Sequence, residues 1–172
     1  MIDYYIGISL GNVCYTAEWG VKNGLRLTKS QGYATCPFDL MVSNYNGVIE
    51  CIRNDFIDFC NPSYLVVNEH GIFNIKYNFG FNHESPGHED LYLHENWPEG
   101  TNHFINNNFK HFIDRYNTRI QAFQYYLTAP RTFINFMIQF KNEVTPNDDF
   151  AKLREVLKLK YPELNYNIHY IP

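Results

Sequence analysis

Cys14 is the residue of this sequence whose type and position best suit covalent chemistry. The apolar, β-rich segment "DYYIGISL" (3–10) ends at Gly11-Asn12, which predicts a strand running into a tight turn. Asn12 is the expected N-cap of a helix closing at Gly24, so Cys14 falls at about the second helical position. Unpaired N–H groups and the positive end of a helix favour the thiolate, the nucleophilic form. The alternative is a small buried hydrophobic residue, as most non-disulfide cysteines are.

A thiolate nucleophile usually needs a general base, and His83 is the histidine best placed for that role. It directly follows a predicted strand and begins the irregular segment 82–100, and such loops often present active-site side chains. The alternative is an exposed loop histidine. Of the other histidines, His169 falls in the final predicted strand as a candidate core residue, and three read as surface or packing residues: His70, His103 and His111.

Asp39, in "CPFDLM" (36–41), is the third candidate for the site. Its neighbours Phe38, Leu40 and Met41 are apolar, so its carboxylate lies either at the surface or buried and paired. In the second case it would orient His83 or cap a neighbouring helix, and capping is the simpler of these two roles.

A metal site is an alternative use of the irregular segment, which carries six potential donors: His83, Glu84, His88, Glu89, Asp90 and His94. Zinc takes three or four such ligands, but the spacing H-x4-H-x5-H matches no standard helical pair. We therefore expect no metal and no cofactor. The patterns GxGxxG, GxxxxGK[ST], GxSxG, CxxC and HExxH are absent from the sequence.

The composition is that of a globular chain. Its 172 residues, 45% hydrophobic and 19% charged, fit a single domain over 1–172. The net charge of −4 offers no basic footprint for nucleic acid, and the scattered basic residues read as a solvated helix face: Lys110, Arg115, Arg119 and Arg131. No run approaches the ~20 apolar residues of a membrane helix, and the first residues do not form a signal peptide. We expect a soluble protein in the cytosol of a cell or infected host, with reduced thiols and no nucleic-acid or membrane partner.

The remaining pattern predicts helices alternating with strands. A helix over 47–60, capped by Ser43 or Asn46, precedes a hairpin formed by "SYLVV" (63–67) and "GIFNIKYNF" (71–79). A long helix runs from Thr101 or Asn102 to Leu127.

The last third of the chain predicts strand, helix and strand. "TFINFMIQF" (132–140) reads as a central strand, a helix over 149–160 follows with Asn147 or Asp148 as its cap, and "LNYNIHYI" (164–171) is the final strand. Parallel pairing with a right-handed crossover is the expected geometry. The fold class is therefore α/β, a single domain with a mixed, mostly parallel sheet flanked by helices, plus a β-hairpin.

The motifs resemble a family of bacterial and viral proteins described as papain-like cysteine peptidases. That family has Ser-Leu-Gly, two variable residues and Cys, then Pro-Phe-Asp-aromatic, and later Phe-x-His. The matching runs are "ISLGNVC" (8–14), "PFDL" (37–40) and "FNHE" (81–84), and "RYNTRIQAFQYYL" (115–127) is similar to its basic-aromatic helix. The likeness covers about residues 4–170. It implies Cys14 as nucleophile, His83 as base and Asp39 as a site residue, acting on a peptide or acyl substrate.

Two positions depart from the family pattern, with Leu40 in place of an aromatic residue and Glu84 in place of aspartate. The order of a cysteine helix followed by a hairpin and His83 agrees with a papain-like core, whereas the strand entering that helix suits a doubly wound sheet. Two other functions stay open. One is a non-cysteine α/β transferase acting on sugars or nucleotides, with its ligand at the carboxyl ends of the strands. The other is a non-enzymatic protein-binding domain with an exposed aromatic surface.

Overall fold

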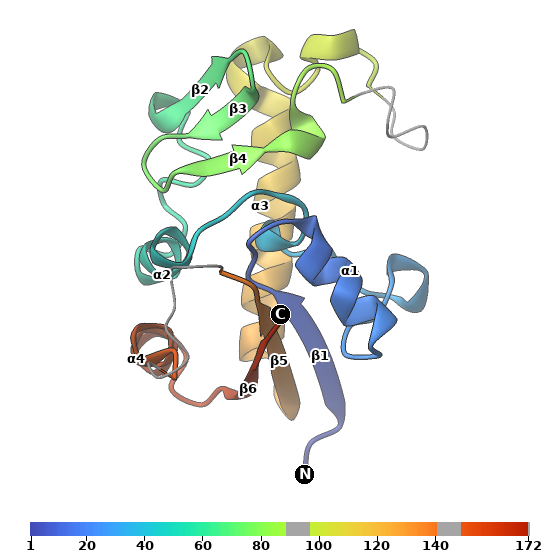
Figure 1. Ribbon diagram of the computed structural model, residues 1–172, viewed down its shortest axis with the longest axis vertical. Helices are drawn as coiled ribbons and strands as arrows, with labels where there is room; N and C mark the ends of the chain where they lie inside the picture. The colour runs from blue at the N-terminus through green and yellow to red at the C-terminus, as the bar shows by residue number, and fades with distance from the viewer. Residues whose placement is uncertain (89–96, 141–148, 172) are drawn as a thin grey trace.

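The computed structural model describes residues 1–88, 97–140 and 149–171, which form two three-stranded sheets and four α-helices (Figure 1). The strands are β1 (Tyr4–Ser9), β2 (Leu65–Asn68), β3 (Gly71–Asn74), β4 (Phe79–Phe81), β5 (Thr132–Ile138) and β6 (Asn165–Tyr170). The helices are α1 (Cys14–Lys22), α2 (Tyr45–Arg53), α3 (Asn106–Thr128) and α4 (Ala151–Lys160). Short 3-10 helices that matter below are η2 (Pro37–Leu40), η4 (Asn82–Glu84) and η6 (Gly100–Asn102).

The first sheet is parallel, in the order β1-β5-β6, with β5 at its centre as its apolar run predicts. Successive side chains of a strand face opposite sides, so the two faces of β5 are covered separately. Phe136 belongs to the main core, whereas Met137 meets α1. A Cβ on Gly20 of α1 would lie 2.3 Å from the Met137 sulfur, which explains why a residue of poor helix propensity stands there.

The second sheet is antiparallel, in the order β2-β3-β4, and includes the predicted hairpin. The prediction of one strand over 71–79 is wrong, because the Asn74 side chain accepts hydrogen bonds from the Lys76 and Tyr77 N–H groups, at 2.9 and 3.0 Å. Asparagine side chains form turns in this way, so the chain reverses there and returns as β4. The α/β class is confirmed, and the antiparallel strands form a sheet of their own.

Several helix boundaries differ from the predicted ones. The α2 helix ends at Arg53 instead of 60, and Asp55 and Phe56 follow in the left-handed region. Its cap is Asn44, whose side chain accepts the Gly47 N–H at 2.7 Å, and neither Ser43 nor Asn46 as predicted.

The long helix begins later in the chain than predicted. Residues 101–102 belong to η6, and α3 begins at Asn106 with left-handed residues at 107–109. The expected caps of α4, Asn147 and Asp148, lie outside the described residues.

An aromatic core joins the two sheets. The Phe38 ring of η2 is fully buried, and its centroid lies 5.8 to 6.3 Å from the rings of four phenylalanines: Phe56, Phe59, Phe79 and Phe123. Such ring pairs add to the stabilisation from burial alone. They fix η2 between β4 and α3. Across the described ranges, no helix is both long and apolar enough to cross a membrane.

Candidate active site

Cys14 is the first residue of α1. It directly follows a turn that is packed tightly against neighbouring segments of the chain. The turn is the Ser9-Leu10-Gly11 part of the motif, and the Gly11 carbonyl accepts a hydrogen bond from the Gln139 N–H at 3.1 Å. Gly11 has a φ of +113°, and a Cβ there would lie 1.7 Å from the Ser43 Oγ, so only glycine fits. The motif therefore sets where the cysteine helix begins.

The N-terminus of α1 is capped differently from the prediction, because Val13 and not Asn12 is the N-cap, without a side-chain hydrogen bond. The backbone N–H groups of Cys14 and Tyr15 hydrogen-bond toward the Cys14 sulfur and lower its pKa. Partial burial, followed by the negative charge of Glu18, outweighs them and raises the pKa of Cys14 above its ordinary value. The helix start alone thus favours the thiolate, as the sequence indicates, but burial and Glu18 act in the opposite direction, and the net effect favours the thiol form of Cys14.

Replacing Glu18 by glutamine is expected to speed alkylation of Cys14 near neutral pH. Removing the negative charge lowers the pKa of Cys14, so more thiolate is present at a given pH. Glu18 is exposed, so we expect a rise of up to about fivefold, the equivalent of the ~0.2–1 kcal/mol of an exposed charge interaction. Iodoacetamide labelling followed by mass spectrometry measures the rate. Glu69→Gln, on the distant β2–β3 turn and 84% exposed, is the control; equal rates in wild type and Glu18→Gln would refute the effect.

His83 lies in η4, immediately after β4, and its side chain is half-buried. Ser85 fixes the backbone that follows it, because its Oγ donates to the Phe81 carbonyl at 2.6 Å and accepts the Ile72 N–H at 2.9 Å. The segment carrying His83 is thus held against β3 and β4.

Glu84, the neighbour of His83, is fully buried and holds η4 against α3. Its Oε1 accepts hydrogen bonds from Arg115 at 3.0 Å and Arg119 at 3.1 Å, and its Oε2 accepts one from the Tyr116 hydroxyl at 3.2 Å. We call these four residues the Glu84 clamp. A buried carboxylate needs such partners, so the clamp fixes the position of η4 on α3.

The clamp is the part of the site that the sequence reading missed. The basic residues of α3 were predicted to lie on a solvated face, which is wrong for Arg119, since it is 6% exposed. The available signal was the spacing of Arg115 and Arg119, four residues apart on one helix face, together with an acid in the Phe-x-His motif.

Residues 42–43 join the turn before α1 to the strand before η4. The Ser43 N–H donates to the Asn12 carbonyl at 2.8 Å, and Val42 pairs with Gly80 of β4 through hydrogen bonds of 2.8 and 2.9 Å. In Figure 1 the start of α1 lies below the end of β4. The same two residues therefore connect the segments that carry the candidate nucleophile and the candidate base.

Asp39 is fully buried and caps η2, the simpler of its two expected roles. Its Oδ2 accepts hydrogen bonds from the Cys36 N–H at 2.7 Å, the Tyr33 hydroxyl at 3.0 Å and Arg26 at 3.1 Å. The backbone N–H of Arg26 donates a hydrogen bond to the Gly20 carbonyl of α1 at 3.1 Å. These hydrogen bonds of Asp39 thus go to Cys36, Tyr33 and Arg26, and Asp39 is linked to the end of the cysteine helix through Arg26.

The four cysteines are free and differ in exposure. Burial raises the pKa of Cys36 and Cys51 well above the ordinary value, and that of Cys60 to about 12. Thiols of this kind stay protonated and unreactive. Cys14 is therefore the thiol whose environment best permits reaction.

The metal alternative loses one of its donors, because Glu84 is engaged in the clamp. His88 is half-buried, and three further donors of that segment lie outside the described residues: Glu89, Asp90 and His94.

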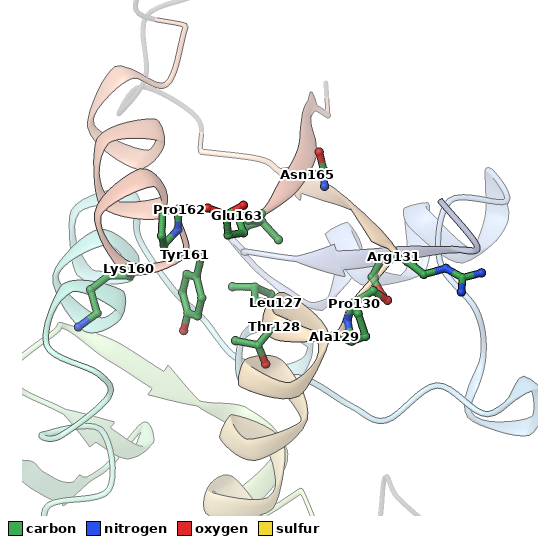
Figure 2. Close-up of a pocket in the computed structure, with 12 residues that line it drawn as sticks. Leu127, Thr128, Ala129, Pro130, Arg131, Lys160, Tyr161, Pro162, Glu163 and Asn165 are labelled. Atoms are coloured by element: carbon green, nitrogen blue, oxygen red, sulfur yellow. The ribbon is translucent and has the colours of Figure 1, made fainter. Parts of the chain in front are cut away.

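A cavity of about 430 Å³ opens at the other end of the parallel sheet (Figure 2). Residues 127–132 and 160–165 line it, at the amino ends of β5 and β6. Cys14 follows the carboxyl end of β1, so the cavity and the cysteine lie at opposite ends of the strands. Ligands of doubly wound sheets bind at the carboxyl ends, so this cavity is not where the transferase alternative requires one.

Comparison with known proteins places the chain at the level of a family. No curated protein and no solved structure matches the chain. A family model matches residues 6–171, a span that includes the cysteine turn, η2 with Asp39 and η4 with His83. The chain therefore belongs to the family described as "Putative papain-like cysteine peptidase (DUF1796)".

Proposed function

We propose that this protein is a cysteine hydrolase that cleaves a peptide or related acyl bond, with Cys14 as nucleophile and His83 as general base. The observation that carries the proposal is the position of Cys14, a partly buried free thiol that is the first residue of α1 and follows the turn at the carboxyl end of β1. The family to which the chain belongs supports the same reaction class.

In the proposed reaction, His83 accepts the thiol proton as the Cys14 sulfur attacks the substrate carbonyl carbon. The new C–S bond pushes the carbonyl electron pair onto oxygen, and the N–H groups of Cys14 and Tyr15 hydrogen-bond to this oxyanion. The bond to the leaving amine or alcohol then breaks, and the leaving group takes the proton from His83. Water, deprotonated by His83, hydrolyses the thioester and restores the thiol. These steps need no cofactor.

Asp39 and Glu84 support the proposed site as positioning residues. Asp39, through Arg26, ties η2 to the end of the cysteine helix, and the Glu84 clamp fixes the segment of His83. We place the reaction in the cytosol of a cell or infected host, where a partly buried thiol such as Cys14 stays reduced.

Labelling with a peptidyl epoxide tests the proposal, because such an electrophile alkylates an activated thiol beside a peptide-binding cleft. We expect one adduct per chain, located on Cys14 by peptide mass spectrometry. Cys60, which is also only partly buried, is the internal control. Labelling shared equally by Cys14 and Cys60, or absent from both, would contradict the proposal.

A further inference from the structure

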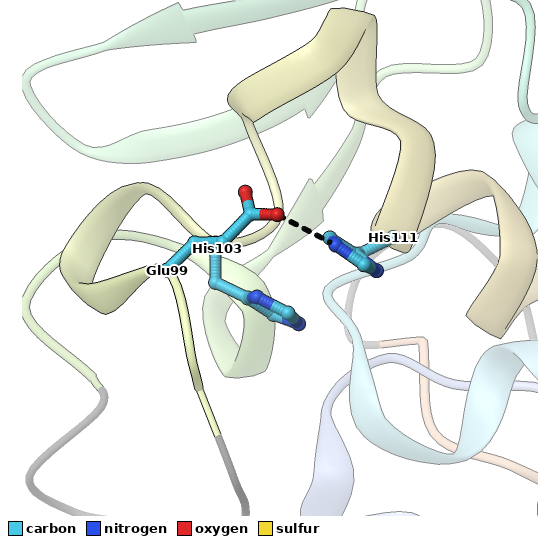
Figure 3. A group of neighbouring side chains, drawn as sticks. All are labelled: Glu99, His103 and His111. Atoms are coloured by element: carbon cyan, nitrogen blue, oxygen red, sulfur yellow. Dashed lines mark hydrogen bonds and ion pairs between the residues drawn. The ribbon is translucent and has the colours of Figure 1, made fainter.

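Glu99, His103 and His111 bring three metal-binding groups together outside the candidate active site. One donor atom from each residue lies within 4.8 Å of the other two. The His111 Nε2 and the Glu99 Oε1 are 3.0 Å apart, and the imidazole rings of His103 and His111 stack at 4.1 Å between centroids. Figure 3 shows both rings edge-on and parallel, with the Glu99 carboxylate directed at His111.

A turn at residues 107–109, which the sequence pattern did not predict, brings these three residues together. His103 caps the end of η6, and residues 107–109 are left-handed, with φ between 54° and 64°. This turn folds the start of α3 back toward η6, so the His111 ring comes to lie on the His103 ring.

His103 supplies an independent observation. The residue is 7% exposed, and its Nδ1 is buried with no hydrogen-bond partner. A buried polar atom without a partner is destabilising, so its presence points to a group that it binds.

The surroundings also suit a bound cation. Aromatic rings of Trp97 and Phe104 lie against His103, at 6.4 and 4.7 Å between centroids, and limit solvent. Arg115, whose positive charge acts on His103, stacks on Phe104 and pairs with Glu84. Its charge is therefore already balanced by a buried carboxylate.

We propose that Glu99, His103 and His111 form a binding site for a divalent transition-metal ion of the Zn²⁺ class. Two imidazole nitrogens and one carboxylate oxygen are a donor set that zinc accepts, with a fourth position left for water. Bond lengths of about 2.0–2.1 Å place donors about 3.3 Å apart in a tetrahedron. Imidazole lone pairs lie in the ring planes, so binding one ion requires the two rings to turn out of the stack seen in the metal-free chain, where the interplanar angle is 14°. The ion would fasten η6 to α3, one turn before the arginine that begins the Glu84 clamp.

Titration of the metal-free full chain with Co²⁺, a visible reporter of zinc sites, tests the proposal. We expect one equivalent to bind with the intense absorption of tetrahedral cobalt, and Zn²⁺ to displace it. His111→Ala and Glu99→Gln, at half-exposed positions, should each weaken binding at least ~10-fold, since even outer-shell losses cost about that much. His70→Ala removes a histidine that also contacts a glutamate, at 3.3 Å on the exposed β2–β3 turn, and should change nothing.

Three results would overturn the site: no stoichiometric binding, binding unchanged in His111→Ala, or a thiolate-to-cobalt charge-transfer band that places the ion on a cysteine. Circular dichroism of each variant confirms that the fold is kept. His103→Ala is a second test. If its far-ultraviolet circular dichroism spectrum equals that of wild type, the fold is kept, and the variant should then fail to bind cobalt.

Discussion

Replacing Cys14 by alanine is expected to abolish acyl transfer while the fold persists. With p-nitrophenyl acetate as a generic acyl donor, the wild-type chain should release a burst of one equivalent of p-nitrophenolate as the Cys14 thioester forms. The variant lacks the attacking sulfur, so both burst and turnover should fall at least ~1000-fold, as losses of a nucleophile do. Cys14 is half-buried, and a change at such a position should lower stability by about 1 kcal/mol or less.

Cys60→Ala is the matched control for this experiment, because it removes another partly buried thiol, the one whose pKa burial raises to about 12. It should keep the burst. A burst that survives in Cys14→Ala and disappears in Cys60→Ala would show that Cys60 is the nucleophile and would contradict the proposed role of Cys14.

Replacing Glu84 by glutamine is expected to destabilise the protein by about 3 kcal/mol or more. The change is nearly isosteric, but it removes the buried negative charge with which Arg115 and Arg119, 24% and 7% exposed, form ion pairs. For a chain of this size the melting temperature should fall by on the order of 10 °C. Because the clamp also fixes η4, alkylation of Cys14 should slow in the variant even well below its melting temperature.

Asp114→Asn is the control for the clamp. Asp114 pairs with Lys110 on the same helix at 2.6 Å, but both side chains are about 60% exposed, so its loss should cost at most ~0.5 kcal/mol. Equal melting temperatures for Glu84→Gln and Asp114→Asn would show that the clamp does not hold η4.

Local patterns predicted the elements that local chemistry determines. The apolar run 132–140 is the central strand of the parallel sheet, and the Gly11 turn does lead into the cysteine helix. Both depend on neighbouring residues, namely a continuous buried strand and a glycine that must adopt positive φ. The α2 helix shows the limit of such patterns: Phe56 and Phe59 continue its apolar periodicity and are buried, yet the helix has already ended at Arg53.

The parts that could not be predicted depend on contacts between distant residues. Glu84 meets Arg115 and Arg119 across more than thirty residues, and no local spacing specifies that pairing. The raised pKa of Cys14 likewise depends on how deeply the thiol is buried, which the helix start alone does not reveal. Asp39 could be expected to cap a helix, but its ion pair with Arg26 needed the fold.

The rate of Cys14 alkylation by iodoacetamide against pH, in wild type and in His83→Ala, is the most direct test of the proposed pair. Because the pKa of Cys14 is raised, an unassisted thiol should react appreciably only above the free-thiol value of ~8.5. If His83 removes the proton, wild type should retain rapid alkylation well below that pH, and His83→Ala should lose it and follow a simple thiol titration. Identical profiles in the two proteins would mean that Cys14 and His83 do not act together, and the proposed mechanism would fail.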